Sequence, residues 1–265
     1  MQVWLPMYYG YMTMARLSKP YTVMTIIIGN YEMVHEIKQK SQFARYLLIT
    51  DRADLKSDTW EVIYDPELQG SNFHKVMDIR WHPWRYTKDE IVVSIDGSIG
   101  VNESLDDLIC QFVNGGYELS LMVHPYRATA DAEYSTWISH RNYPAQRARW
   151  HRELMQRCGY DTAAYRGLYQ MTMMIRRRCR LVESWNNINC GLLMMAGGYE
   201  YDRLDQVLVS FSLNKWFPAA RVMWLSEMVI HSRYLTWYRH GSDQQNIPGK
   251  FIEPYGFNNR VEVVI

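Results

Sequence analysis

Cysteine is scarce in this chain of 265 residues, with four copies at Cys110, Cys158, Cys179 and Cys190. No two of them have the spacing of a zinc knuckle or of a redox CxxC motif, so the sequence predicts neither kind of site. Four thiols in a chain of this size are typical of a reducing compartment, where cysteine packs as a small apolar side chain. We therefore expect a cytoplasmic protein.

Long apolar runs are also missing. The longest, residues 23–28 and 191–198, are far short of the roughly 18–20 residues that a membrane span needs. The apolar, aromatic start of the sequence lacks the basic and hydrophobic regions of a signal peptide. We expect no transmembrane segment.

Neither sign of charge is in excess, since 29 basic residues face 28 acidic ones and the net charge is +1. A dedicated nucleic-acid-binding protein normally has a strong basic excess, so we expect no nucleic acid as a partner. Several catalytic motifs are absent too: the Walker A loop, GxGxxG after a strand, GxSxG and HExxH. Their absence argues against P-loop kinases, Rossmann dehydrogenases, serine hydrolases and zinc proteases.

No linker rich in Gly, Ser or Pro and no internal repeat divides the chain, so we expect one domain over residues 1–265. In its first half, short apolar runs bounded by turn residues indicate five buried strands. These are Tyr21–Ile28, Arg45–Thr50, Trp60–Tyr64, Ile91–Ile95 and Leu119–Val123.

Helices are predicted between several of these strands. They cover Tyr31–Lys40, Phe73–His82 and Ser104–Val113, the last with Ser104 as its N-cap. Alternating strands and helices are typical of an α/β domain with a largely parallel central sheet. Residues 1–125 are therefore predicted to form an α/β half.

The C-terminal half is predicted to be more helical. Helices are expected at Ala130–His140, Ala145–Cys158, Arg180–Met195 and Leu204–Trp216, while Tyr169–Ile175 fits a strand or a helix. Residues 126–240 form this mostly helical half. Residues 241–265 are a polar tail that ends in the β-like Val261–Ile265.

Acidic residues directly follow two predicted strands, Asp51 after the second and Asp96 after the fourth. Open parallel sheets bind ligands beyond the carboxyl ends of their strands. The Asp96-Gly97-Ser98 turn presents a carboxylate there, and Gly97 permits a close backbone approach. One carboxylate together with substrate phosphates is the usual way to hold Mg²⁺ or Mn²⁺. The alternative is a plain turn, because Asp-Gly is a common turn dipeptide.

His124 and Arg127 follow the fifth strand in the same way. Such residues can contact a phosphate or a sugar hydroxyl, and Arg does so through two parallel hydrogen bonds. Glu133 lies early in the next predicted helix and is a candidate general base or acceptor for a sugar hydroxyl. The alternative interpretations are a structural histidine, a surface arginine and a solvated helix acid.

Asp205 and Gln206 lie near the start of a predicted helix. They are either residues favoured by the helix dipole or an active-site acid and amide. The basic cluster at residues 176–180 either neutralises a diphosphate or an acidic partner, or forms a solvated turn.

The order of these motifs resembles the mucilage-related glycosyltransferase-like family. The matching residues are Thr50-Asp51 with Thr59-Trp60, Lys75 with His82-Pro83, Ile95-Asp96-Gly97, then His124, Arg127 and Glu133, and finally Arg203, Asp205 and Gln206. They extend over residues 22–240. Two departures stand out: Ser98 replaces a second acid, and Leu204 is inserted between Arg203 and Asp205.

The resemblance implies a glycosyltransferase A-type fold and a nucleotide-sugar donor, with a glycan or another molecule as acceptor. It implies that residues 1–125 bind the nucleotide and that residues 126–240 form the acceptor side. A divalent metal, Mn²⁺ or Mg²⁺, is expected at Asp96. The donor side is assigned to Asp51, Lys75, Asp96, Gly97, His124 and Arg127. The acceptor side is assigned to Arg203 and Gln206, with Asp205 and Glu133 as catalytic candidates. The alternatives are a non-catalytic carbohydrate- or nucleotide-binding protein of the same fold and a nucleotidyltransferase-like enzyme.

Overall fold

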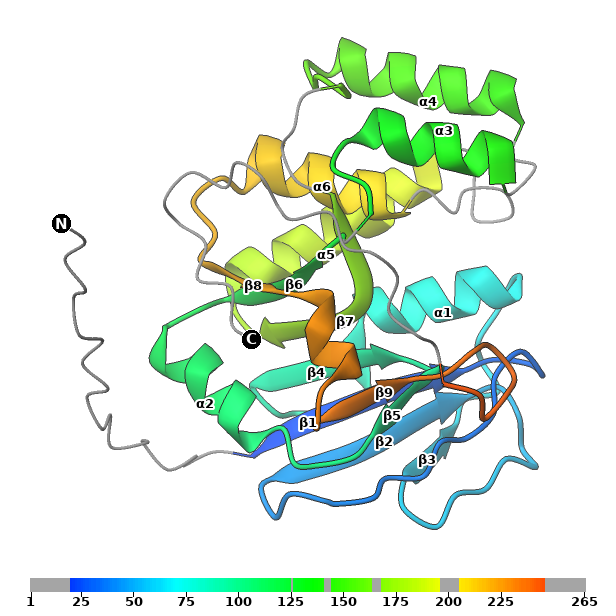
Figure 1. Cartoon of the computed structure of the whole chain (residues 1–265), viewed down its shortest axis with the longest axis vertical. Helices are drawn as coiled ribbons and strands as arrows, with labels where there is room; N and C mark the ends of the chain where they lie inside the picture. Colours follow the sequence, from blue (N-terminus) through cyan, green and yellow to red (C-terminus); the bar gives the residue numbers. More distant parts are fainter. Residues whose placement is uncertain (1–19, 125, 141–143, 164–167, 196–204, 246–265) are drawn as a thin grey trace, which may run out of the picture.

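The computed structural model describes residues 20–124, 126–140, 144–163, 168–195 and 205–245. Within them a seven-stranded sheet has the order β3-β2-β1-β4-β7-β6-β8, and a separate two-stranded sheet pairs β5 with β9 (Figure 1). The strands of the large sheet are β1 (Tyr21–Ile27), β2 (Ala44–Thr50), β3 (Glu61–Tyr64), β4 (Ile91–Asp96), β6 (Leu119–Val123), β7 (Tyr169–Arg177) and β8 (Val222–Leu225). The small sheet consists of β5 (Ile99–Val101) and β9 (Leu235–Trp237).

The large sheet is mostly parallel, as the sequence predicts. β1 pairs in parallel with β2 and β4, β2 with β3, and β6 with β8. β7 runs antiparallel to both of its neighbours, β4 and β6. The ambiguous segment Tyr169–Ile175 is therefore a strand, and it inserts into the sheet formed by the first half of the chain.

Helices cover both faces of the sheet because neighbouring strand residues point to opposite sides. On one face, Val23 packs in the same cluster as Phe112 of α2 (Asp106–Asn114). On the other face, Met24 packs in the same cluster as Ile79 of α1 (Asn72–Trp81). This alternation gives the domain three layers.

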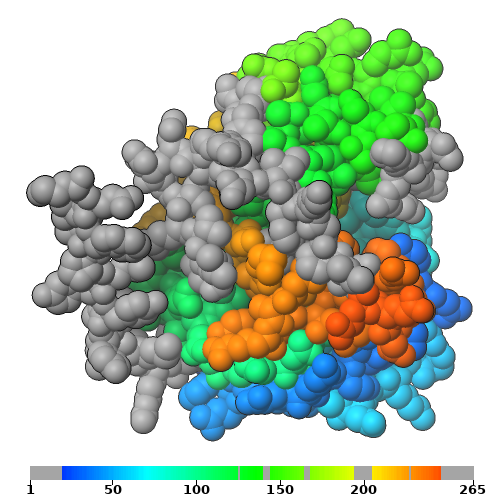
Figure 2. Space-filling view, viewed as in Figure 1, coloured from blue at the N-terminus to red at the C-terminus, as the bar shows by residue number. Residues whose placement is uncertain are grey.

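The face that α1 covers carries most of the helices. A second cluster on that face joins α1 to α3 (Ala130–His140), α4 (Ala145–Arg157), α5 (Arg180–Met195) and α6 (Asp205–Trp216). The opposite face holds α2, the short helix η2 (Glu227–His231) and the small sheet. In Figure 2 the segment with η2 and β9, orange to red, lies across the front of the molecule.

The predicted helix at Tyr31–Lys40 is wrong, because this segment is an irregular loop. Its backbone groups pair with distant residues instead of with each other. The His35 carbonyl accepts the Trp60 indole N–H at 2.9 Å, and the Lys38 N–H donates to the Val101 carbonyl at 3.0 Å. Tertiary hydrogen bonds thus replace the bonds that a helix would make within itself, overriding local propensity.

The start of α2 also differs from the prediction. The helix begins at Asp106 with Leu105 as N-cap, and the Ser104 hydroxyl accepts the Asp106 N–H at 3.1 Å. Ser104 therefore makes a local turn just before the cap. Strands β5, β8 and β9 were not predicted from the sequence, because they are only three or four residues long. The β-like segment Val261–Ile265 lies outside the described residues.

Candidate functional site

A cavity of about 410 Å³ opens at the carboxyl edge of the sheet. Parallel pairing places the ends of β1, β2 and β4 there, with Ile26 beside Asp96. β6 runs in the same direction, since it and β4 are both antiparallel to β7. Asp51 and His124 therefore follow strands that end at the same edge as β4, whose last residue is Asp96, as predicted.

Aromatic and charged side chains line the cavity together. The apolar and aromatic lining residues are Ile26, Ile28, Tyr31, Phe73, Val76 and Trp137. The polar ones are Glu32, Asn72, Arg80, Asp96, Asp205 and His240, and Gly97 completes the lining. Asp96, Gly97 and Asp205, which were singled out in the sequence, thus meet in one cavity.

Asp96 is the last residue of β4 and forms an ion pair with Arg80 of α1. The Arg80 side chain is almost buried, and about a third of the Asp96 side chain is exposed. Burial raises the pKa of Asp96, and the Arg80 guanidinium opposes that shift. The structure thus fixes one cation directly on the carboxylate that was predicted to hold a metal.

Asp205 is the first residue of α6, where the Gln206 N–H donates to its Oδ1 at 3.0 Å. Burial raises the pKa of Asp205 to about 7, although Arg80 and the Gln206 N–H both act to lower it. The negative charges of Glu133 and Asp96 contribute further to the rise. Asp205 is therefore close to half protonated at neutral pH, which suits a group that takes up and releases a proton.

Glu32 and His240 form an ion pair on the same cavity wall. Glu32 also accepts the Gly241 N–H at 3.1 Å, and its side chain is almost buried. The carboxylate of Glu32 is therefore engaged on both oxygens. This pair joins the loop after β1 to the segment that follows β9.

Asp51 and Lys75 form an ion pair with an Nζ–Oδ2 distance of 2.7 Å. The second Asp51 oxygen accepts the Gly29 N–H at 2.8 Å. Burial alone would raise the pKa of Asp51, but the Gly29 N–H and the Lys75 ammonium hold it below its usual value. Neither side chain belongs to the cavity lining, so this pair fixes the turn after β1 beside the cavity.

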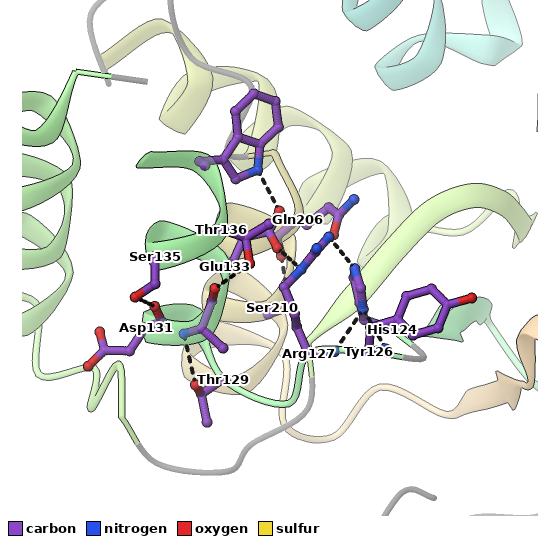
Figure 3. Close-up of polar contacts among 12 residues, drawn as sticks. His124, Tyr126, Arg127, Thr129, Asp131, Glu133, Ser135, Thr136, Gln206 and Ser210 are labelled. Carbon is purple, nitrogen blue, oxygen red and sulfur yellow. Dashed lines mark hydrogen bonds and ion pairs between the residues drawn. The ribbon is translucent and has the colours of Figure 1, made fainter. Parts of the chain in front are cut away.

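His124, Arg127 and Glu133 form a connected network between β6 and α3 (Figure 3). Nδ1 of His124 accepts the Tyr126 and Arg127 backbone N–H groups, each at 3.1 Å. Its Nε2 lies 2.5 Å from an Arg127 guanidinium nitrogen. Burial, followed by the Arg127 charge, lowers the pKa of His124 to about 3, so this imidazole is neutral.

Glu133 is fully buried and pairs with Arg127. It also accepts the Trp137 indole N–H at 2.6 Å, and Trp137 lines the cavity. None of His124, Arg127 and Glu133 belongs to the cavity lining. Their charges are matched inside the network, which supports the Trp137 wall from behind.

Gln206 follows Asp205, and its backbone carbonyl accepts the Ser210 hydroxyl at 2.8 Å (Figure 3). Its side-chain Oε1 is buried and accepts no hydrogen bond among the described residues. Arg203, the other residue assigned to the acceptor side, lies outside the described residues.

Mg²⁺ or Mn²⁺ needs several oxygen ligands around one position. Among the described residues, no group of three or more His, Cys, Asp or Glu side chains is arranged to hold a metal ion. Ser98 stands where a second acid would be needed and is buried. A hard divalent cation prefers free carboxylate oxygens, whereas Asp96 already faces a guanidinium. These residues do not fit the expected metal.

Four residues of the site were not predicted from the sequence: Arg80, Trp137, Glu32 and His240. A signal for Arg80 was present, because Phe73, Val76 and Arg80 follow the spacing that places residues on one helix face. A basic residue on an otherwise apolar face indicates a buried partner. No comparable pattern marks Glu32 and His240, which meet only in the folded chain.

No protein-family model matches this chain, and a search of curated proteins found none similar in sequence. The resemblance to the mucilage-related glycosyltransferase-like family therefore stays a prediction from the motifs. Among the described residues, no helix has both the length and the apolar character needed to cross a membrane.

Proposed function

We propose that this chain transfers a sugar from a nucleotide-sugar donor to a glycan or another acceptor. One observation carries the proposal: Asp96 and Asp205 line the same cavity, together with Phe73 and Trp137. Carboxylates accept hydrogen bonds from sugar hydroxyls, and aromatic rings pack against the apolar faces of sugar rings. A volume of about 410 Å³ has the size of a small-molecule site.

The position of the cavity supports a nucleotide-sugar as donor. Ligands of open α/β sheets bind beyond the carboxyl ends of the strands. A mostly parallel sheet, a single antiparallel strand next to β4 and an Asp-Gly turn after β4 are compatible with a glycosyltransferase A-type fold. In this proposal Asp96 and Gly97 face the donor, while Asp51 and Lys75 hold the turn beside it.

Asp205 is the proposed general base. It takes the proton of the attacking acceptor hydroxyl while the acceptor oxygen bonds to the anomeric carbon and the bond to the diphosphate breaks. A pKa near 7 gives a carboxylate enough basicity for this step and still leaves it substantially ionised at neutral pH. Glu133 supports the Trp137 wall instead of reacting, because its carboxylate is held by Arg127 and Trp137.

The test is a panel of sugar nucleotides, each incubated with the purified chain and analysed for hydrolysis or transfer. We expect one donor to be consumed, and Asp205→Asn to stop consumption without weakening donor binding. If no donor is consumed although one binds, the chain is a carbohydrate- or nucleotide-binding protein. The absence of a second acid at Ser98 favours that second candidate.

A further inference from the structure

Arg80 occupies the place next to Asp96 where a metal-dependent transferase would need a divalent cation. Its guanidinium contacts Asp96 directly and lines the cavity. A metal ion bound at the same carboxylate would lie close to this positive charge and be repelled by it. Glu32 is engaged by His240 and Gly241, so it does not supply a second free carboxylate.

Arg80 is also well built to bind an anion. A guanidinium presents a planar fork of N–H donors that matches two phosphate oxygens at once. The Arg80 side chain is 9% exposed, so its charge is poorly screened by water. Among the described cavity-lining residues the other basic side chain is His240, which Glu32 holds.

A second arginine lies behind Arg80. Arg176 of β7 is fully buried and donates to the Arg80 backbone carbonyl at 2.6 Å and to the Ser94 hydroxyl at 2.6 Å. Burial lowers its pKa to about 9, which leaves it protonated at neutral pH. Within the described residues, Arg176 has no carboxylate partner.

The balance of charged side chains at the cavity determines which ligand charge it favours. Arg80 and Arg176 balance Asp96 and Asp205 when both acids are ionised, and positive charge is in excess when Asp205 holds a proton. An uncompensated buried charge is costly. An anion that enters the cavity and contacts Arg80 relieves this imbalance.

We propose that Arg80, supported by Arg176, is the cation that binds the diphosphate of the donor, so that the chain binds a nucleoside diphosphate without a divalent metal. This inference rests on the proposed function, because the diphosphate is that of the donor. It differs from the expectation of a metal at Asp96. A metal site there predicts that Asp96→Asn loses diphosphate binding, whereas binding by Arg80 predicts that this variant keeps it.

The experiment is isothermal titration calorimetry, which measures the affinity of the full chain for a panel of nucleoside diphosphates and for inorganic pyrophosphate. Each titration is done first in EDTA and then with Mn²⁺. We expect binding in EDTA that Mn²⁺ leaves unchanged. Arg80→Gln should weaken this binding about ten- to hundredfold, the effect of losing charge-assisted hydrogen bonds. Arg85→Gln is the matched control, since Arg85 pairs with Asp78 away from the cavity and should bind as the wild type does.

Asp96→Asn distinguishes diphosphate binding by Arg80 from a metal site on Asp96. It also keeps the proposal testable if the Arg80→Gln chain does not fold. It removes the partner that competes for Arg80, so nucleoside diphosphate should bind as tightly as before or more tightly. A metal site on Asp96 would instead lose binding. The proposal is overturned if binding appears only with Mn²⁺, if Asp96→Asn abolishes it, if a folded Arg80→Gln chain binds normally, or if no compound binds.

Failure of the proposed function gives a different result. If nucleoside diphosphates or pyrophosphate bind in EDTA and depend on Arg80, but no sugar nucleotide is consumed, the anion site stands and the transferase assignment falls. If a donor is consumed only with Mn²⁺, the transferase assignment stands and the Arg80 inference falls.

Discussion

The guanidinium of Arg80 pairs with the carboxylate of Asp96 across 16 positions of the chain, joining the last turn of α1 to the end of β4. The Arg80 side chain is almost buried, while about a third of the Asp96 side chain is exposed to the cavity. Each group therefore fixes the other, and a change at Asp96 acts on Arg80 as well.

Asp96→Asn is expected to slow transfer by about 10²–10³ while the chain stays folded, the usual effect of disturbing one electrostatic stabiliser of a transition state. The amide has nearly the same shape and leaves ground-state binding of the diphosphate to Arg80 intact. It lacks the charge that holds the guanidinium in place for the negative charge that develops in the transition state. Donor consumption measures the rate, and circular dichroism checks the fold. Asp78→Asn, which breaks the exposed pair with Arg85, is the control and should retain its activity. A normal rate in Asp96→Asn would make Asp96 a turn residue only.

The raised pKa of Asp205 predicts a pH dependence of stability. Its pKa is about 7 in the folded chain, against about 3.9 in an unfolded one. The folded state holds the Asp205 proton more tightly than the unfolded state does. The stability that this proton contributes is complete below about pH 4 and is lost as pH rises through about 7. The free energy of unfolding, measured in urea, should therefore fall less between pH 5 and 8 for Asp205→Asn than for the wild type. Asp58→Asn, at an exposed site, should follow the wild type.

The same group sets the expected pH profile of activity. A base must be ionised, so the transfer rate at saturating donor should rise with pH and level off above about 7. A profile that is flat between pH 5 and 8 would contradict the assignment of Asp205 as base.

Glu133→Gln tests whether the buried network is structural. The change leaves Arg127 without its carboxylate partner, which should cost about 3 kcal/mol of stability and lower Tm by about 6–12 °C. Asp131→Asn, on the same helix, breaks only a partly exposed pair with Arg152 and should cost less than about 1 kcal/mol. If Glu133→Gln melts like the wild type but transfers nothing, then Glu133 is a catalytic residue, as the motif comparison assigned it.

The sequence predicts those parts of the fold that are set by local pattern. Buried apolar runs such as Tyr21–Ile28 and Ile91–Ile95 can be recognised because a strand in the middle of a parallel sheet is covered on both faces. The loop at Tyr31–Lys40 was predicted wrongly because its hydrogen-bond partners, Trp60 and Val101 among them, are remote in sequence. Local propensity carries no information about such partners.

In the candidate site, too, the residues set by local pattern could be predicted and those set by remote contacts could not. Asp96 and Asp205 were found because each stands at the end of a strand or the start of a helix, where the chain direction alone places it. Trp137 was not predicted, because its role depends on how α3 packs at the sheet edge. Arg80 was overlooked, although the sequence places it on one helix face with Phe73 and Val76. His124 was assigned to the donor, but a local turn directs its ring nitrogens to Tyr126 and Arg127.

Gly97→Ala tests how tightly the turn after Asp96 is packed. An alanine Cβ at Gly97 would lie 3.0 Å from the Ile26 carbonyl oxygen and 3.0 Å from Cγ of Glu32. The carbonyl belongs to β1, and Glu32 is held by His240, so neither can move away freely. Gly97→Ala should therefore cost about 1–3 kcal/mol, the usual penalty of overpacking, and weaken nucleoside diphosphate binding.

Gly191→Ala is the matched control, since Gly191 lies on the exposed side of α5 with nothing within 4 Å of the added Cβ. Alanine favours a helix interior over glycine by about 1 kcal/mol, so this variant should be more stable than the wild type. Urea unfolding of both variants and the wild type measures these changes, a lower free energy of unfolding for Gly97→Ala and a higher one for Gly191→Ala. If Gly97→Ala is as stable as the wild type and binds diphosphate equally well, the turn has room to adjust, and the close approach of Gly97 to β1 is not required for the site.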